Sequence, residues 1–286
     1  MPRPVQEILQ DIQSLEPLPA VGLKVLELSE RPDVTPSELT TLIETDAALT
    51  AKVLKLANSA LYGCVREIAS LHEAGSRLGT RVLTNLVITS CAARHFRNYG
   101  GQNESAVRRA WERSVANAIS ASLLASISGA VEKHRAYTAG LLQDIGQLVL
   151  ERHFVRERAT IEAELAHGAD LIQAEKSVLG LSHADVGARL AARWNLPEVL
   201  VDTILCHHEP ERARCDPLLA SFVHLGSQVV QACSALEHPP GSSEAREYPL
   251  HDSALLTSGF DGLALASVEE RLVQELGRAQ ELLQLA

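Results

Sequence analysis

The sequence predicts an all-α protein made of two helical lobes. Hydrophobic residues make up 46% of the 286 residues but aromatic residues only 3%, so the core must consist of leucine, alanine, valine and isoleucine. Leucine and alanine favour helices, and they recur in nearly every segment. Apolar residues repeat at helical spacing, and no stretch shows the alternation that is typical of a strand.

The first predicted lobe covers residues 1–100. Asp46 is a predicted helix cap, because an aspartate before an apolar segment can accept hydrogen bonds from the free N–H groups of the first turn. The apolar stripe after it consists of Val53, Leu56, Ala57, Ala60 and Leu61. A longer helix is predicted from about Ala74, with Gly75 and Gly79 near its start. Its apolar side carries Leu78, Val82, Leu86, Thr89 and Ala93.

The stretch from Tyr99 to Asn103 interrupts this pattern, and we place the boundary between the lobes there. The second lobe covers residues 101–236. Ser182 is a predicted helix cap and Pro197 a predicted first-turn proline. The predicted helices are residues 105–128, 134–153, 157–167, 171–179 and 217–236, with two more after Ser182 and after Pro197.

Residues 237–286 form the last predicted unit. Residues 237–252 have the composition of an exposed loop. An amphipathic helix follows, with Val268, Leu272, Leu276, Ala279 and Leu283 on one face. We expect this helix to pack on its own domain, since most amphipathic helices do so.

Composition excludes several classes of function. The net charge of -10 disfavours a nucleic-acid partner, which needs a basic face. No apolar run is long enough to cross a bilayer, and the first residues lack a secretory signal, so we expect a cytoplasmic protein without a membrane partner. The five cysteines show no CxxC pair, which disfavours a zinc-thiolate site. A local arginine cluster is interpreted as a solvated helix face rather than an anion site; it comprises Arg94, Arg97, Arg108, Arg109 and Arg113.

Several motifs, in the same order, resemble those of the HDOD family over Leu15 to Pro210. They are residues 18–21, 45–59, 71–79, 139–146, 183–187, 194–197 and 204–210. Motifs found in the right order are more specific than any one alone. The resemblance implies an HD-domain-like helical bundle in the C-terminal lobe and a role in bacterial signalling.

The resemblance also implies where metal ligands would lie in a related phosphohydrolase. Those enzymes use a histidine, a His-Asp pair and a later aspartate, and the matching positions here are Arg113, Gln143, Asp144 and Ser227. Only Asp144 keeps a ligand. A guanidinium about 5 Å from a divalent ion costs roughly 6–7 kcal/mol at an effective dielectric of about 20. We therefore expect no catalytic residue, no metal and no cofactor, and we predict that Arg113 replaces the metal as the positive partner of Asp144.

Three histidines are candidates for a remaining pocket beside Asp144. His183, His207 and His208 match residues that frame this pocket in metal-bearing relatives. Adjacent residues of a regular helix diverge by about 100°, so we expect that His207 and His208 do not both reach one ion. Hydrogen-bonded structural histidines are favoured over residual metal binding.

The favoured hypothesis is a non-catalytic regulator that acts by protein–protein interaction in bacterial signalling. The suspected partners are a diguanylate cyclase, a response regulator or a histidine kinase, and a homo-oligomer is left open. A second hypothesis is a sensor that binds a nucleotide or phosphate through Arg113 in the former catalytic cavity. A third is a residual metal-dependent phosphohydrolase.

Overall fold

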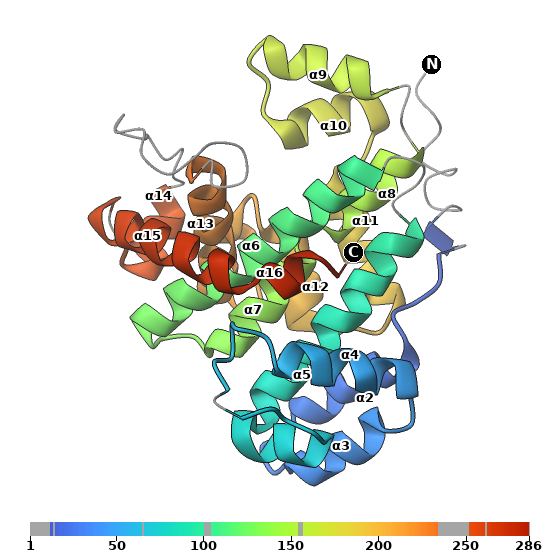
Figure 1. Ribbon diagram of the computed structural model, residues 1–286. Coiled ribbons are helices and arrows are strands. Elements are labelled where there is room, and N and C mark those ends of the chain that lie inside the picture. Colours follow the sequence, from blue (N-terminus) through green and yellow to red (C-terminus); the bar gives the residue numbers. More distant parts are fainter. Residues whose placement is uncertain are drawn as a thin grey trace.

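The computed structural model describes residues 12–13, 15–64, 66–99, 104–153, 157–233, 252–260 and 262–285. Within these ranges the chain forms helices and no strand, which confirms the predicted fold class (Figure 1). None of the helices in these ranges combines the length and the apolar character that a bilayer crossing requires.

The N-terminal helices are α2 (Ala20–Ser29), α3 (Pro36–Ile43), α4 (Ala47–Ala57) and α5 (Leu71–Tyr99). The central helices are α6 (Glu104–Ser128), α7 (Lys133–Leu142), α8 (Ile145–His153), α9 (Arg158–Ala166), α10 (Leu171–Leu179), α11 (His183–Arg193) and α12 (Glu198–Cys206). They are followed by the short 3-10 helix η1 (Pro210–Arg212), α13 (Pro217–Ala232), α14 (Asp252–Ser258), α15 (Gly262–Arg278) and α16 (Gln280–Leu283).

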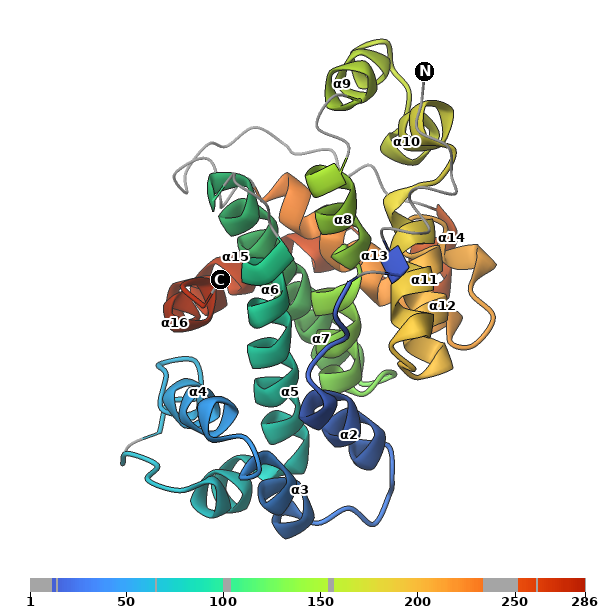
Figure 2. The same cartoon turned by 90° about the vertical axis from the view of Figure 1, so that its right-hand side faces the viewer.

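Helices α2, α3 and α4 all pack against α5 at one end of the molecule (Figures 1 and 2). The predicted cap is confirmed, because the Asp46 side chain accepts a hydrogen bond from the Leu49 N–H. The predicted long helix from about Ala74 corresponds to α5, which begins at Leu71 and is interrupted at Gly79. Gly79 has φ 82° and ψ 167°, a conformation open to glycine only, and it divides α5 by a kink.

The centre of the molecule is α6, which packs against α7, α13 and α15. Helix α5 also contacts α6, α7 and α8, so it joins the N-terminal helices to this centre. The C-terminal helices pack on the chain itself, as predicted: Val268 and Leu272 are fully buried, and Trp111 of α6 donates a hydrogen bond to the Leu282 carbonyl. The proposed division into units 1–100, 101–236 and 237–286 stays a prediction, and residues 237–251 lie outside the described residues.

The predicted helix over residues 134–153 is two helices. Helix α7 ends at Leu142 and α8 begins at Ile145, and Gln143 and Asp144 form the turn between them. The break is decided by packing: α7 packs on α6, whereas α8 packs on α11. The periodicity of the sequence is continuous across the turn, so it does not reveal this change of partner.

Two glycines allow α8 and α11 to approach each other closely. A Cβ atom on Gly146 would lie 2.5 Å from the Gly187 backbone N, and closer still to the His183 carbonyl oxygen. No side chain fits in this space. The crossing therefore requires glycine at residue 146, and it places the start of α11 directly beside Asp144.

We expect Gly146→Ala to destabilise the fold by about 3 kcal/mol or more, because the added methyl overpacks a backbone–backbone contact. Gly277→Ala is the matched control. A Cβ atom at that helical position would meet nothing within 4 Å, so the substitution should change stability by between 0 and about +1 kcal/mol. Urea unfolding of both variants measures the difference. Equal losses of stability in the two variants would show that the crossing of α8 and α11 has room for a methyl group at residue 146.

Candidate functional site

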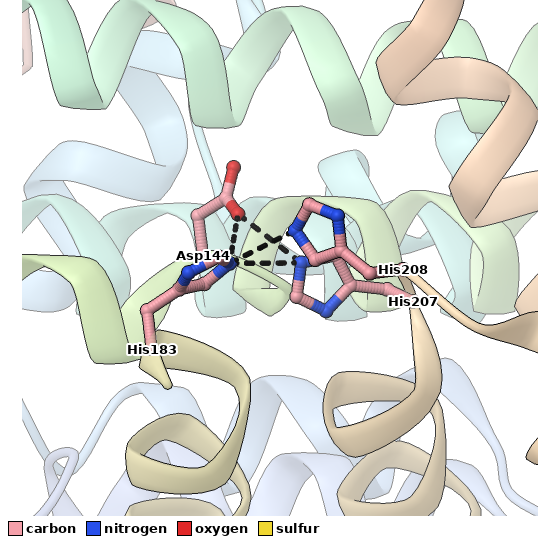
Figure 3. A group of neighbouring side chains, drawn as sticks. All are labelled: Asp144, His183, His207 and His208. Atoms are coloured by element: carbon pink, nitrogen blue, oxygen red, sulfur yellow. Dashed lines mark hydrogen bonds and ion pairs between the residues drawn. The ribbon is translucent and has the colours of Figure 1, made fainter. Parts of the chain in front are cut away.

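Four side chains converge near the crossing of α8 and α11: Asp144, His183, His207 and His208 (Figure 3). Each offers one atom that could bind a metal ion, and these atoms all lie within 4.8 Å of one another. Asp144 comes from the α7–α8 turn, His183 from the first residue of α11, and the other two histidines from the end of α12.

Local sequence fixes the position of His183. The Ser182 side chain accepts a hydrogen bond from the Asp185 N–H, and the Asp185 carboxylate accepts one from the Ser182 N–H. This capping box confirms the predicted cap and makes His183 the first residue of the helix. Its imidazole Nδ1 lies 2.8 Å from Glu175 Oε2, and the same oxygen accepts a hydrogen bond from the His183 backbone N–H.

The two oxygens of Asp144 have different surroundings. Oδ2 accepts hydrogen bonds from Asn117 Nδ2 at 3.1 Å and Gln143 Nε2 at 3.3 Å, and it lies 3.8 Å from Arg113 Nε. The two amide donors and the guanidinium all belong to the chain. Oδ2 is therefore held by the protein.

Oδ1 of Asp144 faces the imidazoles. It lies 3.4 Å from His207 Nε2 and 3.7 Å from His183 Nε2. His183 Nε2 in turn lies 3.3 Å from His207 Nε2 and 3.0 Å from His208 Nε2. One carboxylate oxygen and three ring nitrogens thus point toward a common centre.

Hydrogen bonds on the far side of two rings determine which nitrogen carries the proton. Nδ1 of His183 lies against the Glu175 carboxylate, and Nδ1 of His207 lies 2.7 Å from the Ile204 carbonyl oxygen. Both partners only accept hydrogen bonds, so each Nδ1 is a donor. In the neutral rings the Nε2 lone pairs therefore face each other, and only a shared proton or a cation between them makes this arrangement favourable. Carboxylate and carbonyl partners of this kind orient metal-binding histidines in proteins.

The charges of the site shift its pKa values in opposite directions. Burial raises the pKa of Asp144, but the hydrogen bond from His207 and the charges of Arg113, His207 and His183 outweigh it and hold this pKa well below the ordinary range. Burial lowers the pKa of His183, but the hydrogen bond and charge of Glu175, with the charge of Asp144, outweigh it, and the result is a raised pKa. Burial, together with the charges of His207 and His183, lowers the pKa of His208 to about 2.

The expectation that His207 and His208 cannot face one centre is wrong. It assumed a regular helix through both residues, but α12 ends at Cys206 and the two histidines lie at its end, where the chain turns. Their ring centroids are 4.3 Å apart, and both rings turn toward His183.

The structure places the other predicted residues as follows. Arg113 makes its short hydrogen bond, of 2.7 Å, to Gln147 Oε1, and it lies at ion-pair distance from Asp144; its side chain is 38% exposed. Gln143 is buried and contacts Asp144. Ser227 is buried in α13, where its hydroxyl donates to the His224 carbonyl of its own helix, so the group of four does not include it.

Sequence reasoning missed Asn117 and Glu175. Asn117 lies four residues after Arg113, which puts both on one face of α6. Glu175 lies midway between Leu171 and Leu179 at a spacing of four residues, so an acidic side chain falls on the apolar stripe of α10. This charged residue within the apolar stripe of α10 is the sequence signal that could have identified Glu175.

The donor set suits one transition-metal ion. Imidazole nitrogens and a carboxylate oxygen are common ligands of zinc, iron and manganese. Asp144 Oδ1 and Nε2 of His183, His207 and His208 would hold the ion, and Glu175 and the Ile204 carbonyl would orient two of the rings. The earlier expectation of no metal rested on Arg113, Gln143 and Ser227, and none of these belongs to the converging group.

Comparison with known proteins identifies the family to which this chain belongs. The HDOD domain family matches residues 15–210. An uncharacterized protein of Treponema pallidum (strain Nichols) is 31% identical over 208 residues; the match covers 70% of this chain, and the chain spans about two fifths (39%) of that protein.

Two crystal structures share the fold over nearly the full length. An HDOD domain protein of unknown function from Geobacter sulfurreducens has a TM-score of 0.79 at 27% identity, covering 97% of this chain and 96% of that chain. A candidate phosphohydrolase from Shewanella amazonensis SB2B has a TM-score of 0.73 at 27% identity, covering 97% of each chain.

The raised pKa of His183 gives a testable dependence of stability on pH. The folded state binds this proton more tightly than the unfolded chain, so the contribution is complete below the ordinary value of 6.5 and is lost as pH rises through the folded pKa. We expect the free energy of unfolding of the chelator-treated protein to fall as the pH rises above about 6.5. Glu175→Gln should flatten this slope, because it removes the interactions that raise the pKa.

The control is His72→Asn, which changes an exposed histidine of α5 and should leave the slope unchanged. Urea unfolding at several pH values measures the slope independently of any overall loss of stability in the variant. An unchanged slope in Glu175→Gln would contradict the role given to this carboxylate.

Proposed function

The chain belongs to the HDOD family, and we propose that it is a non-catalytic signal-transduction regulator whose output is the binding of another protein. One observation carries the non-catalytic part of this proposal. The oxygen of Asp144 that a second metal ion would need is already held by Asn117 and Gln143 and faces Arg113.

Two-metal hydrolases clamp the substrate between ions about 3.5–4 Å apart. A carboxylate at this position would have to bind both ions, one through each oxygen. Here Oδ2 of Asp144 accepts hydrogen bonds from two amide nitrogens, and the guanidinium of Arg113 lies on that side. A second cation there would be repelled by a permanent positive charge, so the site supports at most one ion.

A single ion in this site would have four protein ligands: one carboxylate oxygen and three imidazole nitrogens. Structural metal sites are closed in this way, whereas catalytic sites keep a position open for water or substrate. The four groups therefore fit an ion that stabilises the packing of α8, α11 and α12. They leave no room for an activated water molecule in a tetrahedral arrangement.

The proposed partners are signalling proteins, namely a diguanylate cyclase, a response regulator or a histidine kinase. Family membership supports this part of the proposal.

The alternative function, a sensor of nucleotides or phosphates, is less favoured, because Arg113 already binds Gln147 and lies at ion-pair distance from Asp144. A single-metal phosphohydrolase is the second candidate, since the converging group can hold an ion and a relative from Shewanella amazonensis SB2B is a candidate phosphohydrolase.

We expect the purified protein to bind at most one equivalent of a transition metal and to release no product from a phosphodiester such as bis(p-nitrophenyl) phosphate. His207→Ala should weaken metal binding by a factor of about 100 or more, since it removes one of four ligands. His167→Ala, at an exposed histidine of the α9–α10 loop, should leave binding unchanged. Elemental analysis and a titration with Zn²⁺ measure the stoichiometry. Two bound ions, or metal-dependent turnover that His207→Ala abolishes, would favour the hydrolase.

The regulatory part is tested by pairwise binding. The full chain should bind at least one diguanylate cyclase, response regulator or histidine kinase of its source organism with a Kd of about 1 μM or tighter, a binding free energy of about -8 kcal/mol. Calorimetry with purified proteins measures this. Absence of binding to every member of these three classes would contradict the proposed output.

A further inference from the structure

A cavity of about 170 Å³ lies between α8 and the hairpin formed by α9 and α10. This hairpin lies at the opposite end of the molecule from α2, α3 and α4 (Figures 1 and 2). The residues that line the cavity are Gln147, Leu150, Arg158, Ile161, Glu162, Leu165, Leu171, Glu175 and Leu179.

The walls of the cavity are mostly apolar. Five of the lining side chains are leucine or isoleucine, contributed by α8, α9 and α10. Helix α9 buries none of its residues, and Leu165 is among the exposed large apolar residues of the described chain. These side chains line a pocket that is partly open to solvent. A pocket of this volume has room for a small organic molecule of benzene size or somewhat larger.

Glu175 is the polar group at the inner wall, and its side chain is 5% exposed. Its Oε2 accepts both hydrogen bonds from His183. For Oε1, no hydrogen bond occurs among the residues that the structure describes. This oxygen is not among the fully buried atoms that lack a partner in the described chain, so it opens on the cavity, where a donor from a ligand can reach it.

The other charges of the lining cancel. Arg158 Nε lies 2.9 Å from Glu162 Oε1, and both side chains are largely exposed at the rim. The Gln147 amide oxygen is occupied by Arg113. Glu175 pairs with His183 through Oε2, and its Oε1 is left as the acceptor that faces the cavity, which favours a ligand that donates a charged hydrogen bond over a negatively charged one.

We propose that this cavity binds a small amphipathic amine, with its apolar body against Leu150, Ile161 and Leu165 and its ammonium group donating to Glu175 Oε1. The volume suits an apolar body of about six carbon atoms. The inference is independent of the proposed function, because it requires neither a metal at the histidines nor a protein partner. Since Glu175 also holds His183, the ligand would lie one side chain away from the histidine group.

The test compares three ligands of equal length on the full chain: hexylamine, 1-hexanol and hexanoate. We expect hexylamine to bind about tenfold more tightly than 1-hexanol, because a hydrogen bond between charged groups is stronger than one from a neutral donor. Hexanoate should bind more weakly than either, since it places a second negative charge beside Glu175. Calorimetry or ligand-observed NMR gives the three dissociation constants.

Two variants localise the binding. Glu175→Gln should remove the preference for hexylamine over 1-hexanol while leaving alcohol binding intact. Ile161→Phe fills the cavity without touching Glu175 and should weaken hexylamine binding by about tenfold or more. Ile127→Phe, at an exposed isoleucine of α6 outside the lining, is the matched control and should bind hexylamine like the parent protein.

Any of the following outcomes would overturn the proposal. One is the absence of hexylamine binding to the parent protein. Another is equal binding of the amine, the alcohol and the carboxylate, which would indicate nonspecific partitioning. The third is a preference for the amine that persists in Glu175→Gln, or hexylamine binding that Ile161→Phe leaves unchanged. Because no metal or protein partner enters the assay, failure here is distinct from failure of the regulatory proposal.

Discussion

The buried carboxylate of Asp144 is the interaction on which the site depends. A charge in the interior is stable only with donors or cations around it, and the chain supplies them unequally to the two oxygens. Amide donors from Asn117 and Gln143 hold one oxygen with Arg113 nearby, and imidazoles surround the other. The proposal of a non-catalytic protein rests on this asymmetry more than on the loss of any single ligand.

The close crossing of α8 and α11 determines the geometry of the site. Glycine at residues 146 and 187 lets the backbones of α8 and α11 approach closely, and a capping box begins α11 at His183. The end of α12 then presents two adjacent imidazoles to the same centre. A bound ion would add to the stability of this crossing without requiring turnover, since a ligand that binds only the folded state shifts the folding equilibrium.

Glu175 contacts both the histidine group and the cavity under the α9–α10 hairpin. One of its oxygens orients His183, and its side chain also lines the apolar cavity under the α9–α10 hairpin. A molecule that binds this carboxylate from the cavity side changes the electrostatic environment of His183, so the two sites are coupled by linkage. Glu175 is thus the residue of the described chain through which a ligand under the hairpin would affect the histidine group.

The sequence by itself determined the helical fold class, the caps at Asp46 and Ser182, and the candidate residues Asp144 and His183, because local propensity and short motifs encode them. Tertiary packing decided the turn at Gln143 and the end of α12 at Cys206. It also decided the burial of Asn117 and Glu175. Periodicity records which face of a helix is apolar, but it does not record where a helix changes its packing partner. The convergence of three imidazoles on one carboxylate oxygen therefore became visible only in three dimensions.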